Sequence, residues 1–276
     1  MTNNQKNSPA PKNNPDQRPA LRIRGTSTGK TREGPMEGVL QLWDTAIHFY
    51  VWGTRHAKTL VLLHGNGEDH HIFADYVSRW QTRYQVITID TRGHGDSGKG
   101  RQPWDFKLFA EDVALLIKKL GVAPAAVLGF SDGGNTAIHL ALQYPQTVKA
   151  AILVGANLQP EGLRPWFRAG VALRYLRYTL MAPFSARIRR SRELYALMIN
   201  EPRLKPGQLK HVAVPVLVVS GTKDVIRRKH SEAMVKNLPK GQLCYEDHAD
   251  HFAMFHQVGK YQKIFDEFLE SVWNQD

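Results

Sequence analysis

Hydrophobic and polar residues follow two alternating periods along most of this chain. Short continuous apolar runs, of the length of a buried strand, are separated by stretches in which apolar residues recur every three or four positions, as in helices. The expected strands are 59–63, 85–89, 125–128, 150–154, 215–219 and 242–245, and the expected helices are 71–83, 104–120, 133–144 and 256–272. This alternation predicts an α/β fold with a mostly parallel, doubly wound sheet that carries helices on both faces.

Three segments depart from the alternation. Residues 39–43 and 47–52 are strand-like runs that predict a hairpin. Residues 158–211 are arginine-rich and aromatic with a helical pattern that Pro183 interrupts, so we expect a helical cap inserted between the core segments 35–157 and 212–276. Residues 1–34 hold almost no large apolar side chains, and we expect them to form a disordered basic tail.

Composition narrows the class of protein. The 276 residues suffice for one sizeable core, and no run of about 18 apolar residues predicts a membrane span. The polar first residues lead into no apolar segment, which argues against a secretory signal. The single Cys244 rules out an internal disulfide and fits a cytoplasmic location, and no Cys/His cluster has the spacing of a metal site.

The formal net charge of +12 is unevenly distributed. Residues 1–34 hold seven Lys/Arg against two acidic residues, and residues 156–214 hold eleven against three. A basic segment can bind nucleic acid or an anionic membrane, but solvated surface is the simpler interpretation of both segments. We therefore expect no nucleic-acid partner.

The strongest candidate for chemistry is Ser131 within Gly129-Phe130-Ser131-Asp132-Gly133. The motif follows an expected strand and opens an expected helix, which is the setting of a nucleophile elbow. The turn is so sharp that side chains at 129 and 133 would clash, so glycine is needed there. Ser131 is then expected at the tip of the turn, with its hydroxyl exposed.

A serine nucleophile needs a base and an acid that orients the base. Asp224 follows a late strand, and the segment 246–252 supplies two candidate bases, His248 and His251. Together with 64–67 and Ser131, these positions fall at or shortly after the carboxyl ends of strands, where open α/β sheets bind ligands. The sequence therefore predicts one site at this edge of the sheet.

The chain resembles the α/β-hydrolase-fold serine hydrolases over nearly all of residues 36–276. The segments that carry the resemblance are His64-Gly65-Asn66-Gly67, Asp90–Ser97, Gly129–Gly134, Gly221–Asp224 and His251-Phe252.

The resemblance implies roles for the candidate residues. Ser131 is the nucleophile, Asp224 the acid, and His251 the base in preference to His248, because the family's base precedes an aromatic residue. The backbone N–H groups of Asn66 and Asp132 form the oxyanion hole. No cofactor is implied. We expect Arg92, His94 and Asp96 to support the site structurally.

Two features of the sequence point to different substrates. Ser131–Gly134 together with Val154–Asn157 resembles valacyclovirase-like hydrolases of amino-acid esters, in which the acid after the nucleophile contacts the substrate's α-amino group. Asp132 is then either such a substrate-binding carboxylate or a helix-end acid that the helix dipole favours. The cap arginines instead suit acidic or phosphate-bearing acyl groups. Trp166, Phe130 and Phe252 are expected to contact the substrate in an apolar pocket.

The predicted activity is hydrolysis of a small-molecule carboxylic ester through an acyl-enzyme. The same triad also serves peptidases, thioesterases, carbon–carbon-bond hydrolases and cofactor-free haloperoxidases. A non-catalytic receptor for a ligand or an anionic surface is the alternative from another class.

Overall fold

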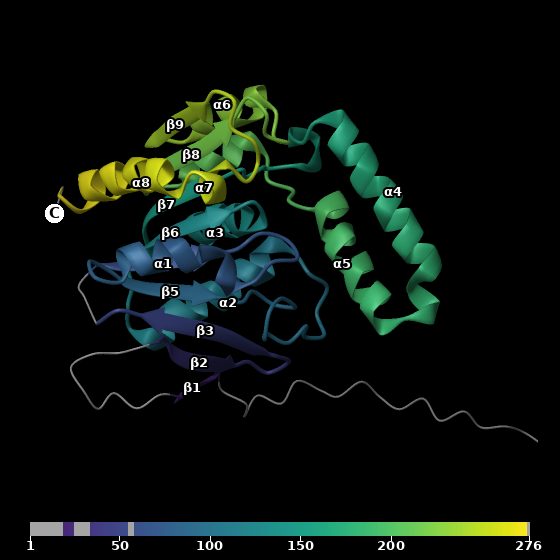
Figure 1. Ribbon diagram of the computed structural model, residues 1–276, viewed down its shortest axis with the longest axis horizontal. Helices are drawn as coiled ribbons and strands as arrows, with labels where there is room; N and C mark the ends of the chain where they lie inside the picture. Colours follow the sequence, from purple (N-terminus) through teal and green to yellow (C-terminus); the bar gives the residue numbers. More distant parts are fainter. Residues whose placement is uncertain (1–18, 25–33, 55–57, 275–276) are drawn as a thin grey trace, which may run out of the picture.

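The computed structural model describes residues 19–24, 34–54 and 58–274. Within these ranges the strands form one sheet with the order β1-β2-β3-β5-β4-β6-β7-β8-β9 (Figure 1). The first three strands and the β3–β5 pair are antiparallel, and all further pairs are parallel. The strands are β1 (Ala20–Arg24), β2 (Met36–Gln41), β3 (Ala46–Trp52), β4 (Thr59–Leu63), β5 (Gln85–Ile89), β6 (Ala125–Phe130), β7 (Val148–Val154), β8 (Val216–Gly221) and β9 (Gly241–Glu246).

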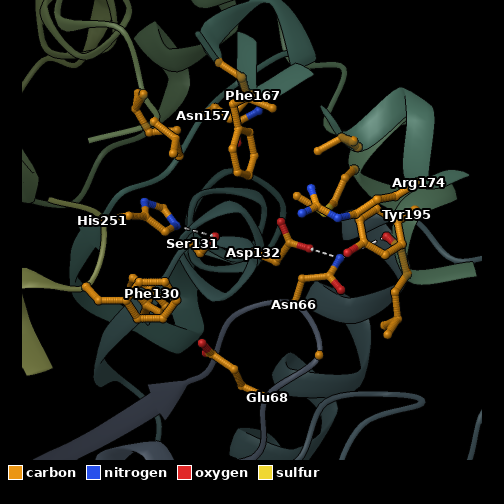
Figure 2. Close-up of a pocket in the computed structure, with 18 residues that line it drawn as sticks. Asn66, Glu68, Phe130, Ser131, Asp132, Asn157, Phe167, Arg174, Tyr195 and His251 are labelled. Carbon is orange, nitrogen blue, oxygen red and sulfur yellow. Dashed lines mark hydrogen bonds between the residues drawn. The ribbon is translucent and has the colours of Figure 1, made fainter. Parts of the chain in front are cut away.

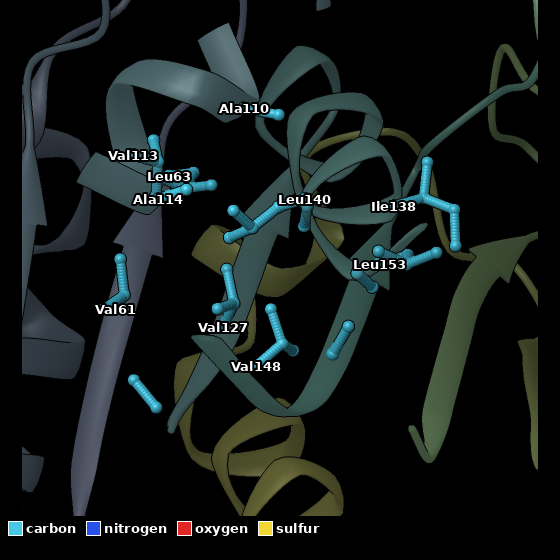
Figure 3. Packing of buried hydrophobic residues seen from close by; sticks show 14 of the residues in the cluster. Val61, Leu63, Ala110, Val113, Ala114, Val127, Ile138, Leu140, Val148 and Leu153 are labelled. Atoms are coloured by element: carbon cyan, nitrogen blue, oxygen red, sulfur yellow. The ribbon is translucent and has the colours of Figure 1, made fainter. Parts of the chain in front are cut away.

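Helices cover both faces of the sheet. On one face, α2 (Phe106–Leu120), α3 (Asp132–Gln143) and α6 (Arg228–Asn237) pack on the strands through a continuous apolar cluster, part of which Figure 3 shows. On the other face, a second cluster joins the strands to α1 (Ala74–Trp80), α7 (Ala253–His256) and α8 (Val258–Trp273). The central strands β4, β5 and β6 are buried along their whole length, as the continuous apolar runs predict. The expected α/β-hydrolase-type sheet is confirmed.

The cap hairpin, residues 165–200, lies within the segment 158–211. It consists of α4 (Pro165–Met181) and α5 (Ala186–Asn200), joined by a short 3-10 turn at Ala182–Phe184 where Pro183 interrupts the helical pattern. Three contacts hold α5 to loops that follow the strands: Asn66 Nδ2 donates to Leu194 O (3.0 Å), Arg190 donates to Gly93 O (2.7 Å), and Lys99 pairs with Glu193. The hairpin therefore lies beside the carboxyl ends of the strands.

Two elements differ from the sequence-based expectation. Residues 20–24 were predicted to belong to a disordered tail, but they form β1, which pairs with β2 because Leu21 packs against the core. Residues 1–18 and 25–33 of that predicted tail lie outside the described residues. Helix α6 was not predicted, because only Ser231 and Met234 of its ten residues are buried.

In the ranges that the structure describes, no helix is both long enough and apolar enough to cross a bilayer.

Candidate active site

Ser131 occupies a strained turn between β6 and α3. Its φ of 52° is one of two positive values found at non-glycine residues of the described chain. A Cβ at Gly133 would lie 2.0 Å from Leu63 O, and one at Gly129 would lie 2.1 Å from Gly133 O. Because both neighbours are backbone atoms, strand and helix can approach this closely only with glycine at 129 and 133. The turn presents Ser131 at the carboxyl edge of the sheet.

His251 and Asp224 lie in line with this serine. His251 Nε2 is 3.1 Å from Ser131 Oγ, and His251 Nδ1 is 2.8 Å from Asp224 Oδ1. Asp224 is buried, and its carboxylate also accepts hydrogen bonds from Ile226 N (3.1 Å) and Ser220 Oγ (3.2 Å). The acid is therefore held in place independently of the histidine, and it can orient the imidazole toward Ser131.

The second candidate base, His248, lies elsewhere. Its side chain is 79% exposed and pairs with Asp247 (3.3 Å), and its backbone N–H donates to Thr222 Oγ1 (2.8 Å). The structure thus brings His251, and not His248, to Ser131.

The backbone N–H groups of Asn66 and Asp132 are available for a ligand. Neither has an acceptor anywhere in the described part of the chain. The loop after β4 passes directly beside the nucleophile, because a Cβ at Gly65 would lie 3.1 Å from Ser131 Cβ. This arrangement suits two donors on one developing oxyanion.

A cavity of about 340 Å³ opens over these groups. Phe130 and Phe252 line it, as expected, whereas Trp166 does not: its side chain is 65% exposed on the outside of α4. The neighbouring Phe167 takes that place, because one residue along a helix turns the side chain by about 100°. The remaining side chains of the cavity are mainly apolar. They come from the segment just before the cap hairpin, from the hairpin itself and from the loop after β8: Leu163, Val171, Leu194, Tyr195, Met198, Val225 and Ile226.

Comparison with known proteins agrees with this geometry. A family model described as the alpha/beta hydrolase fold matches residues 58–178. This protein has the α/β-hydrolase fold. A pimeloyl-[acyl-carrier protein] methyl ester esterase of Neisseria meningitidis is 27% identical over 252 residues, which cover 78% of this chain and 94% of that protein.

Two further comparisons cover similar lengths. The magnesium-chelatase 30 kDa subunit of Rhodobacter capsulatus is 29% identical over 72% of this α/β-hydrolase-fold chain and 85% of that protein. The crystal structure of an enol-lactonase from Burkholderia xenovorans LB400 superimposes with a TM-score of 0.68 at 22% identity, covering 82% of this chain and 97% of that one. The likeness to the enol-lactonase structure, at 22% identity, concerns the fold alone.

Two carboxylates face the cavity of this α/β-hydrolase-fold protein. Burial raises the pKa of Asp132 to about 6, although hydrogen bonds from Asn66 (2.9 Å) and Asn135 (3.2 Å) and the nearby His251 favour its charged form. Burial also raises the pKa of Glu68 to about 7, against the hydrogen bond from Gly65 N (2.9 Å). Figure 2 shows Asp132 between Ser131 and Asn66, with Glu68 below them. The polar part of the cavity is therefore acidic.

Arg174 lies on the other side of Asp132 from His251, next to Tyr195 (Figure 2). Within the described residues it forms no ion pair with Asp132 or any other carboxylate. The cavity therefore combines an acidic end near the nucleophile with a cation at its rim.

Glu68, Phe167, Val171 and Arg174 line the cavity but were not predicted from the sequence. The spacing of the last three, at 167, 171 and 174, places them on one face of α4 and could have identified that face. Glu68 comes three residues after Gly65 in the sequence, and its carboxylate accepts a hydrogen bond from Gly65 N. This short spacing is the one signal that could have pointed to Glu68.

His64 and the three residues predicted to support the site are engaged in internal contacts. Buried His64 accepts from Thr91 N through Nε2 (3.1 Å). Arg92 binds Asp112 and Asp44 through its guanidinium, and Asp96 accepts from Tyr50 Oη (2.8 Å). Burial lowers the pKa of His94 to about 3, so this ring is neutral at physiological pH.

One group of potential metal ligands occurs in the described ranges, formed by Asp69, His70 and His71. All three members already hold internal hydrogen bonds. Asp69 accepts from His71 N (2.9 Å) and contacts His71 Nδ1 (3.0 Å), and His70 Nδ1 bonds Asp90 (2.9 Å). We therefore interpret these three side chains as structural. None of them lines the cavity.

Proposed function

We propose that this α/β-hydrolase-fold protein is a serine hydrolase that cleaves carboxylic esters through an acyl-enzyme. The observation that carries the proposal is the hydrogen-bonded series from Ser131 Oγ through His251 to Asp224, at 3.1 and 2.8 Å, at the floor of a cavity. A nucleophile, its base and an orienting acid in hydrogen-bond reach are the requirements for covalent acyl transfer.

The mechanism follows from these positions. Ser131 Oγ attacks the ester carbonyl carbon while His251 Nε2 takes the hydroxyl proton. The tetrahedral oxyanion receives hydrogen bonds from the N–H groups of Asn66 and Asp132, and Asp224 stabilises the imidazolium. Collapse breaks the bond to the alcohol, which takes the proton from His251. Water, activated by the same histidine, then attacks the acyl-enzyme and releases the acid and free Ser131.

The name of a similar protein supports ester chemistry in particular. The Neisseria relative is a methyl ester esterase, and that name refers to hydrolysis of a carboxylic ester. The cavity of about 340 Å³ has room for a small acyl group against the apolar side chains of the cap hairpin.

An amino-acid ester is the finer proposal. Asp132 adjoins the nucleophile, and its carboxylate accepts hydrogen bonds from two neutral amides, Asn66 and Asn135. An α-ammonium group on the acyl part would supply the cation that this carboxylate lacks. Glu68 lines the same cavity and adds negative charge above its raised pKa of about 7.

An acyl group with a distal carboxylate is the second candidate, and Arg174 is the observation that favours it. Its guanidinium has no acidic partner in the described chain and lies at the cavity wall. In this case the anion binds at Arg174, away from Asp132.

Three p-nitrophenyl esters separate these possibilities: the butyrate, the α-aminobutyrate and the monoglutarate. Ester hydrolysis by the wild type should fall by at least about 10⁴-fold in Ser131→Ala and in His251→Ala, because the triad acts as a unit. His248→Ala, the matched control, should stay within about twofold since that ring is exposed. Hydrolysis that survives Ser131→Ala would overturn the proposed mechanism.

Substrate preference then tests the cavity. If Asp132 binds an ammonium, the wild type prefers the amino ester and Asp132→Asn lowers kcat/KM for this ester alone, by about 10- to 100-fold. If Arg174 binds an anion, the monoglutarate is preferred and Arg174→Gln removes that preference. A wild type that treats the three esters alike contradicts both finer proposals while leaving ester hydrolysis in place.

A further inference from the structure

Helix α4 has apolar side chains on two opposite sides. Phe167 and Val171 face the cavity, and Val171 is the one residue of the helix that is buried. The opposite side carries large apolar residues that contact solvent: Trp166, Leu173, Leu176, Leu180 and, in the turn that follows, Phe184. The side that faces the cavity is covered by the core, whereas this second apolar side is not covered by any part of the described chain.

These five residues, the outer stripe, lie along one line of the helix. At about 100° per residue, the four positions within α4 fall inside about 80° of its circumference. Their exposure is high, at 69% for Leu173 and Leu180 and 84% for Phe184. Figure 1 shows α5 between α4 and the core, so the outer side of α4 is turned away from the rest of the described molecule. An apolar surface of this extent marks an interaction site.

Unpaired positive charge borders the outer stripe. Arg177 lies on α4 next to Leu173 and Leu180, and Arg187 and Arg189 follow Phe184 at the start of α5. None of the three forms an ion pair within the described residues. The acidic side chains of the hairpin region are already engaged, with Glu161 on Arg168, Glu193 on Lys99 and Glu201 on Arg203. A partner that binds this surface should therefore have both an apolar region, to cover the outer stripe, and negative charge, to pair with the arginines.

We propose that the outer stripe docks on an anionic lipid surface. Trp, Leu and Phe on one face with flanking arginines are the composition of helices that lie in the membrane interface, where the apolar side enters the acyl boundary and the arginines meet anionic headgroups. A second copy of the chain fits less well, because packing two stripes together would bring their arginines into contact. A nucleic acid would leave the apolar residues unused.

Docking in this way also positions the catalytic cavity. The stripe and the cavity lie on opposite sides of α4, so the cavity is separated from the lipid by about one helix diameter, roughly 10 Å. The surface would thus hold the enzyme with its cap, rather than its sheet, toward the membrane.

Sedimentation with lipid vesicles tests the proposal on the full chain. The wild type should bind vesicles of phosphatidylcholine with phosphatidylglycerol and should dissociate as salt rises, because headgroup attraction is screened. The double variant Leu173→Asn/Leu180→Asn should weaken binding by at least about tenfold through loss of buried apolar area. Arg177→Gln/Arg187→Gln should weaken binding to the same vesicles and reduce its salt dependence.

The controls keep the outcome specific. Trp43→Ser removes an apolar residue that is 47% exposed in the β2–β3 turn, outside the outer stripe, and this variant should bind as the wild type does. Hydrolysis of a soluble p-nitrophenyl ester, which reports an intact fold, should be unchanged in the stripe variants since none of these residues lines the cavity. Equal binding to pure phosphatidylcholine, no binding to either vesicle, or a stripe-dependent dimer in light scattering would each overturn the proposal.

Discussion

At the scale of single residues, two carboxylates that line the cavity have pKa values higher than those of exposed acids. Asp132 and Glu68 both have pKa values raised mainly by burial, to about 6 and about 7. Asp132 is charged above its pKa and neutral below it, so the ammonium binding that we propose for it should be lost as the pH falls through about 6.

A pH profile should therefore report Asp132. The ratio of kcat/KM for the α-aminobutyrate ester to that for the butyrate ester should rise with pH through a step near 6. This ratio cancels any titration that both esters share, including that of the triad. The step should be absent in Asp132→Asn and present in Glu68→Gln. The profile should cover pH 5 to 8, from roughly one unit below the pKa of Asp132 to one unit above that of Glu68. If the ratio does not change with pH in this range, an ammonium contact with Asp132 is contradicted.

At the scale of elements, the turn from β6 to α3 is the most demanding local structure. Ser131 remains at φ 52° because the backbone on both sides of it is packed against neighbouring strands. The nearest atoms to an added Cβ at Gly133 are the carbonyl groups of Leu63 and His64, which cannot rotate away as a side chain could.

Gly133→Ala should accordingly lower the free energy of unfolding by more than about 3 kcal/mol, or prevent folding, since overpacking here has no compliant neighbour. Urea unfolding followed by circular dichroism measures the change. Gly259→Ala in α8 is the matched control: a Cβ there meets nothing within 4 Å. It should stabilise by about 0.4–1 kcal/mol through helix propensity. A soluble Gly133→Ala protein with wild-type stability would show that the elbow has more room than these distances allow.

At the scale of the whole molecule, buried Arg92 joins three parts of the fold. Its Nε and Nη2 bind both oxygens of Asp112 on α2 (2.9 Å each), and its Nη1 binds Asp44 in the β2–β3 turn (2.8 Å). Arg92 itself lies in the loop that follows β5. The guanidinium neutralises two carboxylates that have almost no access to water.

Arg92→Leu should lower the free energy of unfolding by about 3–5 kcal/mol, because it leaves buried carboxylates without a cation. The exposed pair of Arg228 and Glu232 offers a comparison, and Arg228→Leu should change stability by less than about 0.5 kcal/mol. Both values come from urea unfolding of the full chain. A small effect at Arg92 would mean that water or another cation reaches Asp44 and Asp112.

Much of the fold was predictable because its signals are local. The buried strands are continuous apolar runs and the helices carry an apolar face, so their order predicts the parallel sheet. The positions of Ser131, Asp224 and His251 follow from motifs at strand ends, while their catalytic roles stay predictions. Strand β1 was not predicted because it lies in the segment 1–34, which holds few large apolar residues, and helix α6 was not predicted because it buries only two side chains.

The sequence by itself determined the α/β architecture and the segments that meet at the carboxyl edge of the sheet, because both depend on patterns within a few residues. Only the tertiary structure decided that Phe167 and not Trp166 enters the cavity, that Glu68 and Arg174 reach it, and that the outer stripe of α4 stays uncovered. Each of these depends on how the cap hairpin packs on the core. A helical pattern specifies which residues share a face, but the direction of that face is set by contacts between segments distant in the chain.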